Sequence, residues 1–297
     1  MLDGMETRRL GSSDLEVGAI AYGCWRFAGT SVADARAKLE AALECGMTLV
    51  DTADIYGFDG VEGFGTAEEL MGRVMAEAPA LRERMVLATK GGIVPGVPYD
   101  SSPAYLRTAC EASLRRLGVD VIDLYQVHRP DLLAHPAAVA EALVELQASG
   151  KVRELGVSNY TPSQLAALQA HLGDVPLVTI QPELSLLRLD PIDDGTLDAA
   201  MSRGLTPLAW SPLGGGRIAT GDVAPTLLAA LDALAEREQV SRSAIAIAFV
   251  MAHPSQPVPI VGSQRRDRIL DAAAAAEVQL SRADWYSLVA AAGRELP

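Results

Sequence analysis

The chain has 297 residues, of which 49% are hydrophobic, and its 38 Asp and Glu outnumber its 25 Lys and Arg to give a formal net charge of −13. This acidic balance argues against nucleic acid or an anionic membrane as the main partner. The chain opens with no apolar signal core, and no run reaches the roughly 18 apolar residues of a membrane span, so no membrane segment is expected. The three cysteines, Cys24, Cys45 and Cys110, lack the spacing of a zinc site or a disulfide framework. Reduced thiols in the cytoplasm are the simplest interpretation, and no metal site is predicted.

Strand-like and helix-like segments alternate along the chain after a small hairpin predicted over residues 7–18. Short apolar runs predict strands over residues 19–22, 47–50, 85–89, 121–127, 154–157, 177–180, 206–209 and 257–261. Helical spacing and caps predict helices over 32–45, 66–76, 102–117, 136–148, from 161, 196–202, 227–237, 243–251, after 261, and over 284–297 beside the barrel mouth.

Eight strands joined by helices are typical of a parallel sheet with right-handed crossovers, which can close into a barrel. An α/β barrel of about 250 residues forms one domain, and no linker-like stretch interrupts this chain. The sequence therefore predicts a single α/β domain over residues 1–297, a (β/α)8 TIM barrel with an N-terminal β-hairpin and extra C-terminal helices. A doubly wound open sheet is the alternative, but no G-x-G-x-x-G turn follows residues 19–22, as that fold would favour.

Four polar residues lie at or just past the ends of three predicted strands: Asp51, Tyr56, Lys90 and His128. Carboxyl ends of parallel barrel strands meet at one face, so these side chains are expected to converge there. Taken singly, each has a common structural role, such as a helix cap for the Asp or a solvated position for the Lys. Together they suit carbonyl reduction, in which a proton must reach the oxygen as hydride reaches the carbon. Tyr56 is the candidate proton donor, because a nearby ammonium such as Lys90 lowers the pKa of a phenol.

The local sequences around these residues, 49–56 (LVDTADIY), 88–90 (ATK) and 126–131 (QVHRPD), resemble the aldo-keto reductase family. The resemblance extends from residues 8–11 (RRLG) to 260–263 (IVGS). It implies that the four residues form a catalytic tetrad in which Asp51 supplies the counter-charge to Lys90 and His128 orients the carbonyl oxygen. It also implies a nicotinamide nucleotide laid across the barrel mouth.

The resemblance extends to residues that would hold this cofactor. Ser158, Asn159 and Gln181 would bind the carboxamide, Trp210 would lie against the nicotinamide, and Trp25 and Arg26 would line the mouth. Ser211, Leu213, Gly215 and Arg217 would surround the pyrophosphate, and Gly262, Ser263 and Arg268 the adenosine phosphate. Each has a plainer alternative: Ser158 and Asn159 as a helix cap, the tryptophans as packing residues, the glycines as a flexible turn, and residues 265–266 as a solvated helix face.

Two departures from the family pattern weaken the phosphate site: Gly262 stands where a lysine is common and Ala272 where an adenine-binding asparagine is common. An arginine near the ribose favours NADPH as the cofactor, and NADH is the alternative. The predicted activity is NADPH-dependent reduction of an aldehyde or ketone to an alcohol. The alternatives are an aldolase-type lyase that forms a Schiff base through Lys90, and a nucleotide-binding regulatory subunit with little turnover.

The expected partner is a small carbonyl compound held by loops at residues 58–65, 92–100, 130–133 and 214–224. Arg26 and Arg129 could bind an acidic substrate, so this class stays among the candidates. The sequence specifies neither the substrate, nor the direction of the reaction in the cell, nor the oligomeric state.

Overall fold

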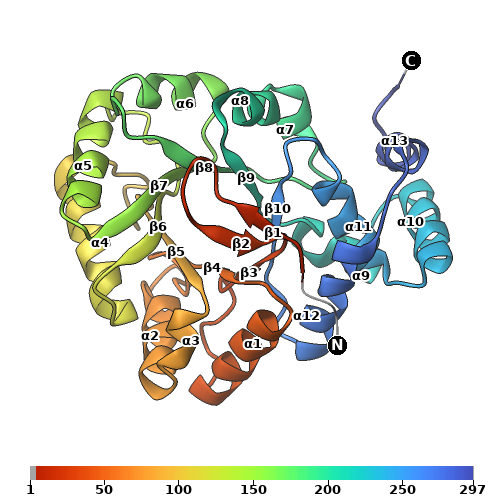
Figure 1. Cartoon of the computed structure of the whole chain (residues 1–297), viewed down its shortest axis with the longest axis horizontal. Helices are drawn as coiled ribbons and strands as arrows, with labels where there is room; N and C mark the ends of the chain where they lie inside the picture. Colours follow the sequence, from red (N-terminus) through yellow and green to blue (C-terminus); the bar gives the residue numbers. More distant parts are fainter. Residues whose placement is uncertain (1–4, 297) are drawn as a thin grey trace.

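The computed structural model describes residues 5–296, so residues 1–4 and 297 of the predicted domain lie outside the described residues. Eight parallel strands close into a barrel in the order β10-β3-β4-β5-β6-β7-β8-β9, with helices around it (Figure 1). The predicted (β/α)8 barrel is confirmed, and each strand lies beside its neighbour in the chain. The strands are β3 Ala21–Gly23, β4 Leu49–Asp51, β5 Val86–Gly91, β6 Ile122–Val127, β7 Val152–Ser158, β8 Leu177–Gln181, β9 Thr206–Ala209 and β10 Val258–Val261.

The helices follow the predicted order, with short additional turns. They are α1 Val32–Glu44, α2 Thr66–Glu77, α3 Ala80–Glu83, α4 Pro103–Leu117, α5 Pro136–Ala148, α6 Pro162–Gln169, α7 Asp190–Asp193, α8 Thr196–Arg203, α9 Arg217–Thr220, α10 Pro225–Glu238, α11 Arg242–Met251, α12 Arg266–Ala273 and α13 Arg282–Ala291, with 3-10 turns η1 Gly214–Gly216 and η2 Ala274–Glu277. Local chemistry explains several starts. The Ser102 side chain caps α4, and Thr161 and Gln164 form a capping box on α6.

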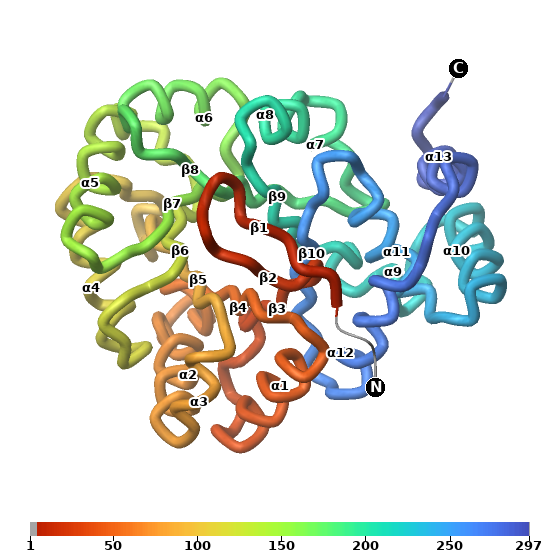
Figure 2. Tube along the Cα trace, viewed as in Figure 1, coloured from red at the N-terminus to blue at the C-terminus, as the bar shows by residue number. Residues whose placement is uncertain are grey.

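Two boundaries differ from the prediction. Residues 19–20 are buried but form a bend, so β3 covers 21–23 rather than 19–22. A run of apolar residues predicts that a segment is buried, whereas backbone hydrogen bonds to a neighbouring strand decide where the strand begins and ends. The last helix, predicted over 284–297 beside the barrel mouth, covers Arg282–Ala291 and packs against α10 (Figure 2). It lies there because Trp285 stacks on Phe249 of α11 and donates from Nε1 to its carbonyl at 3.1 Å.

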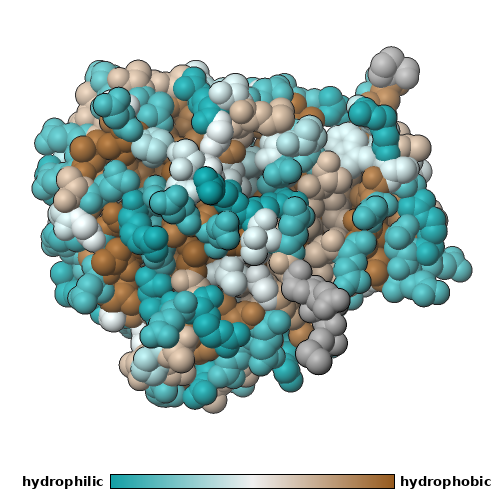
Figure 3. Space-filling model, in the orientation of Figure 1, coloured by the Kyte–Doolittle hydropathy of each residue, from teal (hydrophilic) through white to brown (hydrophobic). Residues whose placement is uncertain are grey.

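The predicted hairpin, β1 Thr7–Arg9 and β2 Glu16–Gly18, lies across one end of the barrel (Figure 1). Leu10, Leu15 and Val17 are buried there and pack with Leu49 and Leu124 from the strands. On this face hydrophilic and hydrophobic residues are interspersed (Figure 3). The hairpin fills this end, so ligands have access from the opposite end of the barrel, where the strands terminate.

Within residues 5–296, no single helix is long and apolar enough to cross a membrane. The one helix pair in this described range that meets the length and composition of a span, when both segments are taken together, is Gly214–Thr220 and Pro225–Glu238, bent by 66°. The same residues contain no group of three or more His, Cys, Asp or Glu side chains that could hold a metal ion.

Candidate active site

Neighbouring strands place Asp51 and Lys90 close together inside the barrel. Asp51 ends β4 and pairs in register with Ala88 of β5. Because side chains alternate along a strand, Lys90 points to the same side as Ala88, one step nearer the mouth. Lys90 Nζ donates to Asp51 Oδ2 at 2.6 Å, to the Thr52 carbonyl at 2.7 Å and to Tyr56 Oη at 3.3 Å. The structure therefore brings together the phenol, the ammonium and the carboxylate that the sequence singled out.

The Lys90 side chain is fully buried, yet it stays charged. Burial by itself lowers the pKa of Lys90, but the Asp51 carboxylate and the Tyr56 phenol act in the other direction, and the pKa is raised above its ordinary value. Lys90 is thus a permanent ammonium at neutral pH, held by three oxygen acceptors.

The phenol of Tyr56 responds differently from the expectation. Burial raises its pKa, the Lys90 ammonium lowers it, and the net shift is upward. Lys90 thus lowers the pKa of Tyr56 as expected, but burial raises that pKa by more, because loss of hydration disfavours the phenolate. Tyr56 is consequently protonated at neutral pH, the form a proton donor needs, and Lys90 can stabilise the negative charge that appears as the proton leaves.

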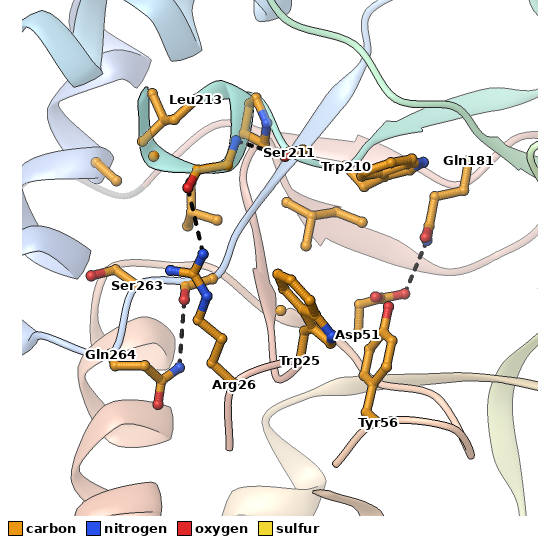
Figure 4. Close-up of a pocket in the computed structure, with 18 of the residues that line it drawn as sticks. Trp25, Arg26, Asp51, Tyr56, Gln181, Trp210, Ser211, Leu213, Ser263 and Gln264 are labelled. Atoms are coloured by element: carbon orange, nitrogen blue, oxygen red, sulfur yellow. Dashed lines mark hydrogen bonds between the residues drawn. The ribbon is translucent and has the colours of Figure 1, made fainter. Parts of the chain in front are cut away.

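The Asp51 carboxylate is oriented by two amides at the bottom of the site. Gln181 Nε2 donates to Asp51 Oδ1 at 3.0 Å (Figure 4), and Gln126 Nε2 lies 3.5 Å from the same oxygen. Gln181, assigned by resemblance to a nicotinamide contact, lines the cavity, and its amide nitrogen also donates to Asp51. Sequence analysis did not select Gln126, although a glutamine two residues before His128 in a buried strand points to the same side and was the available signal.

His128 completes the group from the end of β6. Its ring lies edge-on to Tyr56, with 5.7 Å between ring centroids. Burial lowers the pKa of His128 well below its ordinary value, and Lys90 and Arg129 add to the shift. The imidazole is therefore neutral and can donate one N–H to a carbonyl oxygen without adding a positive charge.

Asn159 links the strand ends around this centre. Its backbone is left-handed with φ 60°, a conformation that asparagine tolerates better than most residues. Its Nδ2 donates to the His128 carbonyl at 3.1 Å and to Ser158 Oγ at 2.8 Å, and its Oδ1 accepts from Trp210 Nε1 at 3.1 Å. Thr161 caps α6, so the plainer interpretation of Ser158 and Asn159 as that helix's cap is wrong.

A cavity of about 860 Å³ extends from Tyr56 and His128 to the start of α12. It gathers most residues assigned to the cofactor by resemblance: Trp25, Arg26, Ser158, Asn159, Gln181, Trp210, Ser211, Leu213, Gly215, Gly262, Ser263 and Arg268. Arg217 does not line it, because its guanidinium turns to Asp222, 3.1 Å away. The cavity also takes in residues that sequence analysis did not select: Ile55, Ser243, Gln264 and Asp271.

The middle of the cavity suits a pyrophosphate. Gly214, Gly215 and Gly216 have positive φ, and a Cβ on either of the last two would meet no atom within 4 Å. Ser211 Oγ accepts from the Gly215 amide at 2.9 Å, and the Gly215 carbonyl lies 3.5 Å from Arg26 Nη2 (Figure 4). An open glycine segment beside a guanidinium allows close approach of a phosphate.

The end of the cavity near α12 carries positive charge, but fewer arginines line it than the sequence over residues 265–268 suggests. Arg265 and Arg268 line it, while Arg266 turns to Glu44 at 3.5 Å. Arg265 pairs with Asp267 at 2.5 Å, which leaves Arg268 as the better candidate for an adenosine phosphate. The cavity thus has a proton donor, Tyr56, and a cation, Arg268, in its lining, which suits a nicotinamide nucleotide.

One buried carboxylate beneath the site has no role in this chemistry. Asp54 is fully buried, and neither of its carboxylate oxygens has a hydrogen-bond partner among residues 5–296. Burial raises its pKa to about 8, the buried Glu68 adds to this, and Arg116, which pairs with Glu68, opposes it. Asp54 thus takes up a proton on folding, so its contribution to stability falls as pH rises from its ordinary pKa of about 4 towards 8.

Replacing Asp54 by asparagine is expected to remove this loss, because a neutral amide of the same shape does not ionise. The gain in the free energy of unfolding should be near zero at pH 4 and on the order of a few kcal/mol at pH 8. Thermal unfolding of wild type and variant across this range measures it, with exposed Asp120→Asn as the matched control. Parallel curves for wild type and Asp54→Asn would show that Asp54 is ionised in the folded protein.

Comparison with known proteins places this geometry in a family. Residues 19–292 match the model of the Aldo/keto reductase family. A protein from Novosphingobium aromaticivorans named 6-dehydroglucose reductase is 56% identical over 98% of this chain and 97% of its own length. A protein of the same name from Agrobacterium fabrum is 39% identical over 97% of this chain and 99% of its own.

A solved structure agrees with the sequence relatives. The thermostable aldo-keto reductase Tm1743, crystallised with the inhibitor epalrestat, superposes with a TM-score of 0.85 at 25% identity, covering 97% of this chain and 100% of that one. Members of this family generally use NAD(P)H. The chain therefore belongs to the aldo/keto reductase family and is an oxidoreductase enzyme.

Proposed function

We propose that this enzyme uses NADPH to reduce the aldehyde group of a carbohydrate, 6-dehydroglucose being the first candidate, with Tyr56 as the proton donor. The observation that carries the proposal is the contact of 3.3 Å between Tyr56 Oη and the buried Lys90 ammonium, beside a cavity of about 860 Å³. The names of two relatives that cover nearly the whole chain suggest the substrate.

Each residue of the site has a definite task in this reaction. When bound, the dihydronicotinamide supplies a hydride to the carbonyl carbon. Tyr56 and the neutral His128 bind the carbonyl oxygen, and Tyr56 gives its proton to that oxygen as negative charge develops there. Lys90 stabilises the resulting phenolate, and Asp51 holds Lys90 in place. Solvent then returns a proton to Tyr56, so the enzyme ends the cycle in its starting state.

The cofactor preference is expected to depend on Arg268. If its guanidinium binds the adenosine phosphate of NADPH, Arg268→Ala should weaken NADPH roughly 10–100-fold and NADH much less, because hydrogen bonds to charged groups contribute about 1.5–3 kcal/mol. Fluorescence titration with both nucleotides measures the two dissociation constants. Arg266→Ala is the matched control, since Arg266 faces Glu44 outside the cavity. Equal weakening of both nucleotides would mean that Arg268 does not recognise the extra phosphate.

The two alternative functions make different demands on Lys90. A Schiff base requires a free amine as nucleophile, whereas Lys90 is an ammonium paired with Asp51 at 2.6 Å. The structure thus disfavours the lyase. A regulatory subunit would retain the cavity without turnover, and no feature of residues 5–296 favours it over catalysis.

The direct test follows NADPH absorbance with 6-dehydroglucose and a panel of other aldehydes, ketones and sugars. Rapid oxidation of NADPH that requires Tyr56 supports the proposal. Tight binding of NADPH with negligible turnover across the panel would instead indicate a regulatory role. Borohydride trapping of a substrate carbon on Lys90, without nucleotide, would indicate a lyase.

A further inference from the structure

Among the described residues, the charges around the cavity leave one guanidinium without a partner near Tyr56 and His128. Asp51 is paired with Lys90, and Asp271 accepts from Ser241 Oγ at 2.6 Å. Arg129 follows His128 directly and lines the cavity. Within residues 5–296 it forms no ion pair or side-chain hydrogen bond, and its guanidinium lies over the Trp210 ring. Its donors are therefore free for a ligand close to the proton donor.

Other cavity cations are further from the reacting centre or already engaged. Arg26 turns away from Tyr56, towards the loop that contains Gly215 (Figure 4). Arg268 lies at the start of α12, and Arg265 is paired with Asp267. The charge of Arg129 is thus available to the substrate rather than to the dinucleotide phosphates.

The surroundings of Arg129 hold it in place and partly remove its guanidinium from water. Leaving its N–H donors without a hydrogen-bond partner there costs free energy. Its guanidinium carbon lies 5.9 Å from the centroid of the Trp210 ring, within the range of a cation–π contact. The side chain is half-buried, and Ile55, Phe58 and Ile93 add apolar lining to the same cavity. A partly desolvated guanidinium gains when a ligand presents two oxygen acceptors side by side, which match its planar fork of N–H groups.

We propose that Arg129 determines substrate class by binding two adjacent hydroxyl oxygens of the substrate, so that the enzyme prefers polyhydroxylated aldehydes to simple alkanals. This inference rests on the proposed function and extends it from one candidate sugar to a rule of recognition. An aldehyde that carries a carboxylate presents the same pair of oxygens, and the experiment separates the two sources.

The test compares kcat/KM for three aldehydes in wild type and Arg129→Met: 6-dehydroglucose, succinic semialdehyde and butanal. Methionine keeps an unbranched apolar side chain but has neither the N–H donors nor the charge that lies over the Trp210 ring. The ratio of kcat/KM for 6-dehydroglucose to that for butanal should fall roughly 10–100-fold, the effect expected when hydrogen bonds to a charged group are lost. The loss should lie mainly in KM, because these contacts exist in the ground state and in the transition state alike.

Two further variants define the interpretation. Arg203→Met, at an exposed position at the end of α8, should leave the ratio unchanged. Arg129→Lys should recover little of the preference for the sugar aldehyde, because a point charge lacks the planar fork. An unchanged ratio in Arg129→Met would overturn the inference, and so would a wild-type enzyme that prefers succinic semialdehyde to the sugar aldehyde and loses that preference in the variant.

The outcome is distinguishable from failure of the proposed function. If wild type reduces 6-dehydroglucose only when Tyr56 is present, and Arg129→Met retains the wild-type selectivity, the function stands and the role of Arg129 falls. If wild type reduces no hydroxylated aldehyde, the proposed function and this inference fall together.

Discussion

Tyr56→Phe is expected to lower kcat for carbonyl reduction by roughly 10²–10⁴-fold, the usual contribution of a positioned proton donor. The phenyl ring fills the same space and keeps its edge contact with His128, whose centroid lies 5.7 Å away. What disappears is the only hydroxyl within hydrogen-bonding distance of Lys90 Nζ among residues 5–296. The variant then lacks a proton donor for the carbonyl oxygen whose conjugate base the Lys90 ammonium could stabilise.

The effect should be confined to turnover. NADPH dissociation constants for Tyr56→Phe should lie within about twofold of wild type, because no phosphate contact changes. Tyr286→Phe removes a hydroxyl from an exposed tyrosine on α13 and serves as control. Steady-state rates measure the effect on turnover, and fluorescence titration measures the effect on nucleotide binding. Wild-type turnover in Tyr56→Phe would make the acid assignment wrong.

Lys90→Met is expected to disable the reaction to a similar extent for a different reason. The proton donor remains, but the cation that lowers its pKa is gone, while burial and the Asp51 carboxylate, both of which raise that pKa, remain. The phenolate formed on proton transfer would be unstabilised inside the barrel. The rate at neutral pH should therefore fall by roughly 10²-fold or more.

The variant also leaves Asp51 as a buried charge without its cation, which destabilises the fold. The double variant Asp51→Asn/Lys90→Met removes both charges and is expected to recover thermal stability but not activity. Unfolding temperature and kcat, measured on both variants, separate the two effects. Full activity of Lys90→Met at neutral pH would show that the ammonium does not assist Tyr56, and recovery of activity in the double variant would show that misfolding caused the loss.

The positions of the reacting groups could be predicted because they depend on local pattern. Asp51, Lys90 and His128 each end, or nearly end, a short apolar run, and such runs form buried parallel strands. Once eight strands close into a barrel, their ends must meet at one face. The match to the family sequences around Tyr56 then indicated the tetrad, and the structure brings its members into contact.

The sequence by itself determined the barrel, the hairpin and the residues that gather at the mouth, since periodicity and strand ends are properties of neighbours in the chain. Only the tertiary structure decided that the pKa of Tyr56 is raised rather than lowered and that Gln126 and Gln181 contact Asp51. It also decided that Arg129 has no ion-pair partner within residues 5–296, while Arg217 pairs with Asp222. These outcomes depend on burial and on which side chains from distant segments lie within a few ångströms. Burial and distance arise only when the chain has closed on itself, so no local pattern encodes them.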